Sequence, residues 1–379
     1  MSGDAQMKSA HDQQTIRGLF ESADVCVDGN RPWDIQVHTP AFFPSVLAGG
    51  SLALGESYMD GWWDCEALDQ FFYRIMDARL DKKARTSSQF MRTVIRAKLT
   101  NAQRKSKAYK VAKHHYDIGN DLFSIMLDRW LNYSCGYWAR AATLDEAQIA
   151  KLDLVCRKIG LESGMRILDI GCGWGGFAKY AAKNYGVNVV GITVSSEQVT
   201  FANTFCRGLP VEIRLQDYRS LDEEFDGIVS IGMFEHVGFK NYRTYMNVVH
   251  RCLAPGGLFL LHTIAGNTST TTTDAWLNKY IFPDSMLPSA KQINAAVEGL
   301  FVLEDWHSFG QDYDPTLMAW HRNFTSRWDK IKNAYDQRFY RMWTYYLLSC
   351  AGAFRSRRNQ LWQMVFSKTG IQGGYQSIR

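Results

Sequence analysis

The chain has 379 residues, and its 46% hydrophobic and 21% charged content is typical of a folded globular protein with room for two domains. No apolar run reaches the roughly 18 residues that cross a bilayer. The eight cysteines are scattered and show neither a Cys-x-x-Cys pair nor zinc-ligand spacing, so we expect no metal site. Residues 1–14 lack the pattern of a secretory signal, which favours a cytoplasmic protein with free thiols.

The net charge of +5 is unevenly distributed. Residues 79–115 contain twelve Lys and Arg against the single acid Asp81, which gives +11 there and −6 for the rest of the chain. This stretch is either a solvated helical linker or a patch that attracts lipid headgroups or nucleic acid. Charge alone does not separate these alternatives.

We expect a small α/β domain over residues 1–100, a basic linker over 101–115 and a larger domain over 116–379. In the first domain, residues 35–37 alternate as a strand does, and the glycine-punctuated aromatic residues of 55–64 are predicted to form its core.

From residue 149 onward the sequence alternates between apolar strands and helices. A helix is expected after the glycine-rich turn through Tyr185, another after Ser195, and a third over 241–252. The predicted strands are 166–170, 187–193, 211–215, 226–231 and 258–262. This order predicts a Rossmann-like, doubly wound α/β sheet with its ligand at the carboxyl ends of the strands.

The turn after the first strand reads Asp169-x-Gly171-x-Gly173-x-Gly175. Glycines let the backbone turn tightly and approach a ligand closely. The spacing differs from the Gly-x-Gly-x-x-Gly of dinucleotide sites, and the second strand ends in Thr193 instead of an acid. Asp169 suits a ligand that carries an ammonium and a sulfonium group, so we predict S-adenosylmethionine as the cofactor.

The glycine-rich turn resembles motif I of the class I methyltransferases. That resemblance implies that Gly171 and Gly173 pass under the amino-acid part of the cofactor. It also implies that Thr193 and Gln198 meet the ribose and methionine side. The adenine would then contact the residues after the third strand, which are Gln216, Asp217 and Tyr218.

Two polar residues follow the fourth and fifth strands directly. Glu235 and His262 should both point into the cofactor crevice, where a Glu–His pair suits acid–base chemistry. The alternative interpretations are structural, with Glu235 as a helix cap and His262 as a satisfied histidine at the end of a strand.

Several further segments have unusually specific sequence patterns. They are Tyr133-Ser134-Cys135-Gly136-Tyr137-Trp138, Gly232-Met233-Phe234-Glu235-His236-Val237-Gly238, Leu261-His262-Thr263-Ile264, Lys279-Tyr280-Ile281-Phe282-Pro283, Asp305-Trp306-His307, Tyr313-Asp314-x-Thr316-Leu317 and the run from Tyr346 to Arg355. In these segments the chain resembles the bacterial cyclopropane-fatty-acyl-phospholipid synthases, from about Gly50 to the C-terminus. The related mycobacterial mycolic-acid enzymes lack the amino-terminal domain, which favours the phospholipid enzymes.

This resemblance implies transfer of a methylene group from S-adenosylmethionine to the cis double bond of an unsaturated phospholipid acyl chain. It implies that a bound bicarbonate accepts the proton, held by Cys135, Glu235, His262, the backbone of Ile264 and Tyr313. Tyr133 and Ser134 would contact the cofactor, and Cys350 is a further candidate in the active site. The resemblance also implies a homodimer at the inner face of the membrane, in contact with anionic headgroups.

Other functions remain open from the residues alone. A lipid C-methyltransferase that does not close a ring would use the same cofactor site. An RNA methyltransferase would fit the aromatic and basic composition, but no RNA-binding module is recognisable, so we expect no nucleic acid partner. A lipid or nucleic-acid binder with a vestigial cofactor site is disfavoured by the intact glycine-rich turn.

Overall fold

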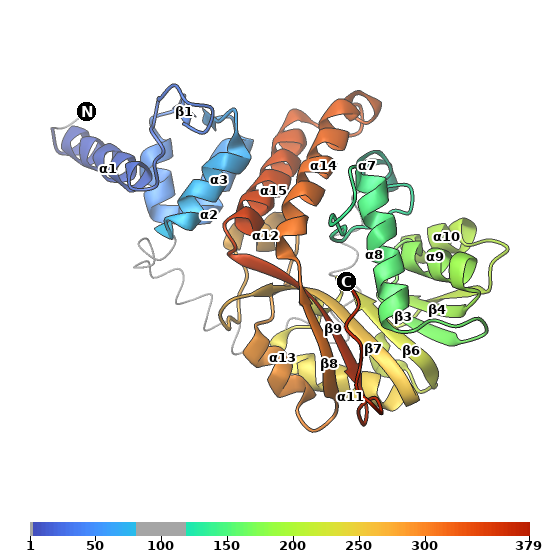
Figure 1. The fold of residues 1–379 in the computed structure, drawn as a ribbon. Helices are drawn as coiled ribbons and strands as arrows, with labels where there is room; N and C mark the ends of the chain where they lie inside the picture. Colours follow the sequence, from blue (N-terminus) through green and yellow to red (C-terminus); the bar gives the residue numbers. More distant parts are fainter. Residues whose placement is uncertain (1–2, 81–118) are drawn as a thin grey trace. The chain divides into compact units, whose positions relative to one another are not determined.

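The structure, a computed structural model, describes residues 3–80 and 119–379 (Figure 1). These residues form two compact units. The first unit combines the described part of 1–99 with 272–283 and 317–358, so it draws on two segments of the predicted larger domain. The second unit contains the described part of 100–271 together with 284–316 and 359–379. Apart from its first two residues, the basic stretch 79–115 lies outside the described residues.

The first unit is mainly helical and is built around aromatic side chains. Its helices are α1 (Gly3–Glu21), α2 (Phe42–Met59), α3 (Leu68–Asp77), α12 (Ala275–Tyr280), most of α14 (Tyr313–Ser326) and α15 (Gln337–Arg355). The strand predicted at 35–37 is only the two residues of β1 (Gln36–Val37), which pairs antiparallel with β2 (Trp63–Asp64). Trp63 is fully buried and packs against Phe42, Tyr58 and Phe71, so the predicted aromatic core is present.

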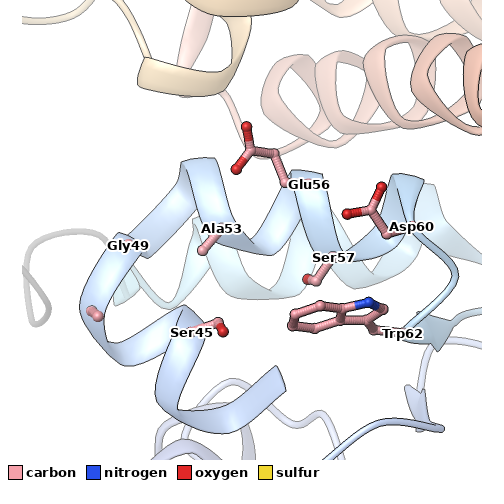
Figure 2. A pocket seen from close by; sticks show the side chains of 8 residues that line it. Ser45, Gly49, Ala53, Glu56, Ser57, Asp60 and Trp62 are labelled. Atoms are coloured by element: carbon pink, nitrogen blue, oxygen red, sulfur yellow. The ribbon is translucent and has the colours of Figure 1, made fainter. Parts of the chain in front are cut away.

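Helix α2 is kinked at Gly50, whose φ of 56° only glycine adopts readily. Beside the kink lies an open pocket of about 370 Å³ (Figure 2). The carboxylate of Glu56 accepts hydrogen bonds from Lys279 and Tyr280, and that of Asp60 accepts one from Arg338 Nε at 2.8 Å. Because both carboxylates already have cationic partners, they present no uncompensated charge to a ligand.

The second unit is organised by a seven-stranded sheet in the order β5-β4-β3-β6-β7-β9-β8 (Figure 1). Its strands are β3 (Arg166–Ile170), β4 (Asn188–Thr193), β5 (Val211–Leu215), β6 (Phe225–Ile231), β7 (Leu253–Gly266), β8 (Val302–Ser308) and β9 (Asn359–Ser367). The first five are parallel, as predicted, and β9 runs antiparallel between β7 and β8. The sheet order reverses beside β3, so its carboxyl end is the position where such folds bind ligands.

Helices cover both faces of this sheet. On one face, α8 (Leu144–Lys158) and α9 (Gly176–Tyr185) pack on alternate residues of β3, β4, β6 and β7, including Ile167 and Leu260. On the other face, α11 (Tyr242–Cys252) and α13 (Ala290–Val297) pack on neighbours such as Leu168 and Phe259. Parallel strands that are covered on both faces explain why the sequence reads as continuous apolar runs.

The helix-capping signal predicted at Ser195 is present in the structure. The Ser195 hydroxyl accepts a hydrogen bond from the backbone N–H of Gln198 and so caps α10 (Ser196–Phe205). Within residues 3–80 and 119–379, no helix combines the length and the apolar composition needed to span a membrane.

Packing in the first unit leads to a stability prediction. A Cβ added at Gly352 in α15 would lie 2.6 Å from Phe72 Cβ and 2.7 Å from the backbone N of Tyr73 in α3. Since backbone atoms cannot swing aside, we expect Gly352→Ala to reduce the free energy of unfolding by about 1–3 kcal/mol. Urea denaturation followed by tryptophan fluorescence would measure the loss.

Gly18→Ala in α1 is the matched control, because nothing lies within 4 Å of the added methyl group. Alanine favours helix over glycine by up to about 1 kcal/mol, so this variant should be at least as stable as the parent. A Gly352→Ala protein that also kept full stability would contradict the close packing of α15 on α3.

Candidate active site

The glycine-rich turn lies directly between β3 and α9. Gly171, Gly173 and Gly175 all have positive φ, at 84°, 54° and 84°. A Cβ at Gly171 would lie 2.7 Å from the side chain of Met233, whereas a Cβ at Gly173 would meet nothing within 4 Å. The backbone at Gly173 therefore borders open space, as a loop that lies against a ligand requires.

Asp169 lies at the carboxyl end of β3 and is buried. Its Oδ2 has no hydrogen-bond partner among the described residues. Burial raises the pKa of this carboxyl to about 7, although the nearby ammonium group of Lys151 opposes the rise. An unpaired carboxylate in this position fits a ligand that brings a positive charge, as the ammonium group of S-adenosylmethionine does.

The next two strand ends also present polar groups. At the end of β4, the hydroxyl of Thr193 donates to Gln198 Oε1 at 2.7 Å, which leaves Gln198 Nε2 as a buried donor without a partner among the described residues. After β5, Gln216 is half-buried, and its Nε2 donates to Ser220 at 3.3 Å. These groups fit the polar edge of a cofactor, in agreement with the unpaired carboxylate on β3.

Asp217 and Tyr218, predicted for the adenine, are both buried. The two oxygens of Asp217 accept hydrogen bonds from the backbone and the guanidinium of Arg219, at 2.9 and 3.0 Å. The ring of Tyr218 packs against Tyr245 with centroids 5.0 Å apart. Asp217 is thus internally paired in this structure, and its role toward the adenine stays a prediction.

The segment that contains Tyr133, Ser134 and Cys135 is attached to α8 by two buried polar side chains. Lys151 Nζ donates to Asn132 Oδ1 and to the hydroxyl of Ser134, both at 3.0 Å. Gln148 Nε2 donates to the carbonyl oxygen of Ser134 at 2.8 Å. Burial lowers the pKa of Lys151 to about 8, and the neighbouring carboxylates oppose this.

Helix α7 (Asn120–Met126) lies beside the glycine-rich turn. The indole of Trp174 donates to Asn120 at 2.9 Å, and Phe123 packs on Trp174 and on Tyr133, with centroids 4.7 and 5.1 Å apart. The structure thus brings Tyr133 to the same edge as the predicted cofactor loop.

Glu235 follows β6, as predicted, whereas His262 lies within β7, opposite the last residue of β6, because β7 continues to Gly266. Glu235 lies in the short helix η2 (Phe234–His236) after β6, and its Oε1 accepts a hydrogen bond from the backbone N–H of Ile264 on β7 at 2.6 Å. Its Oε2 has no partner among the described residues, and burial raises the pKa of this carboxyl to about 7. Glu235 is therefore bonded to the neighbouring strand and does not act as a simple helix cap.

His262 on β7 is 1% exposed, and its Nδ1 lies 3.2 Å from Gln363 Nε2. Burial, with the positive charges of Lys151 and Lys158, holds its pKa well below the usual value. The ring is therefore neutral at physiological pH. Its Nε2 has no partner among the described residues, so one ring nitrogen remains for a ligand.

Cys135 lies in a loop and Tyr313 is the first residue of α14, both outside the sheet, and contacts of residues next to them connect the two segments. Thr316, one turn after Tyr313 in α14, accepts a hydrogen bond from the backbone N–H of Gly136 at 3.1 Å. Phe309, four residues before Tyr313, packs against both His262 and Tyr137, with centroids 6.0 and 5.3 Å apart. Cys135 is buried with its pKa raised well above the usual value, so it is a neutral thiol.

Cys350 is placed differently from the other candidates. It lies on α15 in the first unit, whereas the other predicted site residues all belong to the second. Burial raises the pKa of its thiol to about 12, so it stays protonated at neutral pH and has no thiolate character.

Sequence reasoning missed three buried polar residues of this region: Gln148, Lys151 and Gln363. Gln148 and Lys151 share a helix face with the buried Leu152 and Val155, so polar residues on an apolar stripe were a usable signal. Gln363 had no such signal, because its partner is 101 positions away on another strand.

Comparison with known proteins identifies cyclopropane synthases among the similar proteins. The sequence model of a family described as mycolic acid cyclopropane synthetase matches residues 103–364. The cyclopropane-fatty-acyl-phospholipid synthase of Escherichia coli K12 is 53% identical over 361 residues, which are 95% of this chain and 94% of that protein. A probable fatty acid methyltransferase of Pseudomonas putida is 36% identical over 69% of both chains.

Solved structures agree with this relationship. The cyclopropane synthase MmaA2 of Mycobacterium tuberculosis is 32% identical, with a TM-score of 0.65 over 69% of this chain and 98% of that one. The mycolic acid cyclopropane synthase CmaA1, solved with SAH and CTAB, is 33% identical, with a TM-score of 0.64 over the same shares. The fold of the second unit is that of the class I methyltransferases, as predicted.

The open space at Gly173 leads to a binding prediction. Gly173→Val would place a branched side chain where the backbone borders the cofactor region, and valine tolerates a φ of 54° poorly. We expect calorimetry to show at least a hundredfold loss of S-adenosylmethionine affinity in a protein that is still folded.

Gly208→Ala is the control, because this glycine also has a positive φ, at 82°, and nothing within 4 Å of an added Cβ. It precedes β5 and so lies at the opposite, amino edge of the sheet. The control should lose some stability from strain yet bind the cofactor normally. Normal affinity in Gly173→Val would mean that the cofactor does not pass over this turn.

Proposed function

The chain belongs to the cyclopropane synthase family, and on that premise we propose that it closes cyclopropane rings on unsaturated phospholipid acyl chains. It is an S-adenosylmethionine-dependent transferase. The 53% identity to the phospholipid enzyme extends over 95% of the chain, which includes the amino-terminal residues outside the family match at 103–364. This coverage favours a phospholipid substrate over a mycolic acid.

One observation supports ring closure in particular. Glu235 Oε2 and His262 Nε2 are buried polar atoms without partners among the described residues. Glu235 lies directly after β6, and His262 lies on the adjacent strand β7, opposite the last residue of β6. A simple methylation at nitrogen or oxygen does not require such a pair. A small oxyanion such as bicarbonate would give both groups a partner, with the imidazole as donor and the carboxyl, or the O–H of the anion, completing the second hydrogen bond.

Bound S-adenosylmethionine supplies an electrophilic methyl group to the alkene, and a bound bicarbonate would supply the base for the proton that leaves. The π electrons of the alkene would form the new C–C bond to this methyl carbon while its bond to the sulfonium sulfur breaks, so that S-adenosylhomocysteine leaves and the neighbouring alkene carbon becomes cationic. Loss of a proton from the added methyl group then frees the electron pair that closes the ring. Within this scheme we assign the anion site to Glu235, His262, Tyr313 and Cys135, and to the backbone of Ile264, whose N–H donates to Glu235 Oε1 and so holds that carboxyl in place.

The residues around His262 must also exclude water, which would otherwise capture the cation. Phe309 packs against both His262 and Tyr137. These aromatic rings provide an apolar wall, and a ring face stabilises a nearby cation by about 0.5–2 kcal/mol. Cys350 has no step to perform in this scheme, since its thiol remains protonated.

We further propose that the protein associates peripherally with the inner face of the membrane as a homodimer. The sequence support is the +11 charge of residues 79–115, which lie almost wholly outside the described residues. Each Lys or Arg near an anionic surface contributes about 1 kcal/mol, and salt screens this attraction. Residues 1–100 would form the lipid-associated domain, with 101–115 as linker and 116–379 as the catalytic domain.

The proposed activity predicts a specific lipid product. Incubation with S-adenosylmethionine and vesicles of cis-unsaturated phospholipids should add one CH₂ to each modified chain and remove the double bond, as measured by mass spectrometry. Anionic vesicles should be modified faster than zwitterionic ones at low salt, with the difference shrinking at high salt. A product that gains CH₂ but retains the double bond would favour the alternative, a lipid C-methyltransferase without ring closure.

Glu235→Gln tests the anion site. Glutamine keeps the acceptor for Ile264 N–H but removes the ionisable group, so S-adenosylmethionine affinity should persist while ring closure slows about 10²–10³-fold. Added bicarbonate should partly restore the rate, measured as initial rate against bicarbonate concentration in degassed buffer. His262→Ala and Tyr313→Phe should combine with it non-additively, because all three would serve one anion.

The control for this change is Glu223→Gln, which affects half-buried ion pairs with Arg166 and Arg214 and lies before β6, whereas Glu235 lies after it. Its rate should match that of the parent. A parent enzyme indifferent to bicarbonate, together with a fully active Glu235→Gln, would return Glu235 to a structural role.

A further inference from the structure

Three polar side chains form a row across the antiparallel part of the sheet. In the strand register His262 of β7 lies opposite Gln363 of β9, which in turn lies opposite His307 of β8. Directly opposite residues share a face of the sheet, so these side chains are neighbours. The same face carries Leu260 and Val365, which pack under α8 and α9, so the row interrupts an otherwise apolar surface.

Gln363 is fully buried, and its Nε2 lies 3.2 Å from His262 Nδ1. An amide nitrogen can only donate, so Nδ1 must accept and the single proton of the neutral ring must be on Nε2. The opposite amide orientation would leave an NH₂ group with two unpaired buried donors. The orientation present leaves one N–H and the carbonyl Oε1 without a partner among the described residues, which costs less because buried N–H groups are left unpaired more rarely than carbonyl oxygens.

The charges around the row keep the ring from gaining a second proton. Lys158 is fully buried on α8, and its Nζ lies 3.1 Å from His307 Nδ1 and 3.4 Å from Asp305 Oδ2. Lys151 and Lys158 both oppose protonation of His262, in addition to its burial. A neutral ring with one fixed tautomer is the result.

We propose that Gln363 is a positioning residue that fixes the Nε2–H tautomer of His262, so that this histidine donates a hydrogen bond to an oxyanion and does not act as the base. Histidines that act as bases usually have a carbonyl or carboxylate acceptor on Nδ1, which leaves the Nε2 lone pair toward the substrate. In this protein the partner of His262 Nδ1 is the amide donor of Gln363. Nδ1 is therefore the acceptor of the ring, and Nε2–H is the donor. The proposal rests on the anion site of the proposed function, to which it adds the direction of one hydrogen bond.

Two variants of Gln363 separate the tautomer from packing. Gln363→Glu offers a carboxylate acceptor, which should draw the proton to Nδ1. Gln363→Met keeps a similar side-chain volume but cannot hydrogen-bond to His262, so this histidine should lose its preference for one tautomer. Both should bind S-adenosylmethionine with near-parent affinity, since Gln363 lies on β9, away from the glycine-rich turn.

Nitrogen-15 NMR of histidine-labelled full-length protein reads the tautomer directly. Among the nine histidines, His262 can be assigned by comparison with His262→Asn. The parent should show an unprotonated Nδ1 and a protonated Nε2. Gln363→Glu should show the reverse, with at least a tenfold rise in the half-saturating bicarbonate concentration. Gln363→Met should show a mixture and a smaller rise.

A parent spectrum with protonated Nδ1 would overturn the proposal, as would Gln363 variants with normal bicarbonate dependence. If either variant fails to fold, the parent spectrum still decides the tautomer. The predicted tautomer together with bicarbonate-independent rates in the parent would leave the assignment of Gln363 intact and overturn the bicarbonate step of the proposed function instead.

Discussion

The buried ammonium group of Lys151 connects the parts of the chain that form the cofactor edge of the sheet. It donates to Asn132 and Ser134, and it faces the carboxylates of Asp128 and Asp169 across the same buried region. Burial lowers the pKa of Lys151 to about 8 and raises that of Asp169 to about 7, and the attraction between the opposite charges opposes both shifts. Each charge therefore favours the charged form of the other, so the segment that contains Ser134 and the acid on β3 are electrostatically coupled.

The same edge of the sheet concentrates polar atoms that the described residues leave unsatisfied. Asp169 Oδ2 and His262 Nε2 lie on β3 and β7, and Gln198 Nε2 and Glu235 Oε2 lie after β4 and β6, so the four atoms come from four neighbouring strands of the parallel part of the sheet. A buried polar atom without a partner costs about 1–3 kcal/mol, and folded proteins contain few of them. Their concentration where parallel strands end is explained if a ligand satisfies them, and the mixture of acidic and donor groups matches a cationic cofactor beside a small anion.

Much of this could be predicted from local sequence. Apolar runs were sufficient to predict five parallel strands and the placement of Asp169 and Glu235 at strand ends, and the resemblance of the glycine-rich turn to motif I implied the class I fold. The strand that carries His262 is longer than predicted and continues to Gly266. The sequence did not reveal that 272–283 and 317–358 pack with the amino-terminal helices, because such packing depends on contacts between distant segments. A sequence motif also does not reveal that Arg219 donates hydrogen bonds to Asp217, or that Cys350 lies in the first unit while the other site residues lie in the second.

The antiparallel strand β9 shows why the chemistry of a histidine cannot be deduced from its own neighbours in sequence. A shift of one residue in the β7–β9 register would turn Gln363 to the face of α11 and α13 and bring an apolar side chain opposite His262. That register is held by apolar residues, since Trp362 and Met364 pack on one face and Val365 on the other. The hydrophobic pattern of β9 thus decides which nitrogen of His262 has the proton, so that packing far from the reacting atoms determines the direction of a hydrogen bond in the active site.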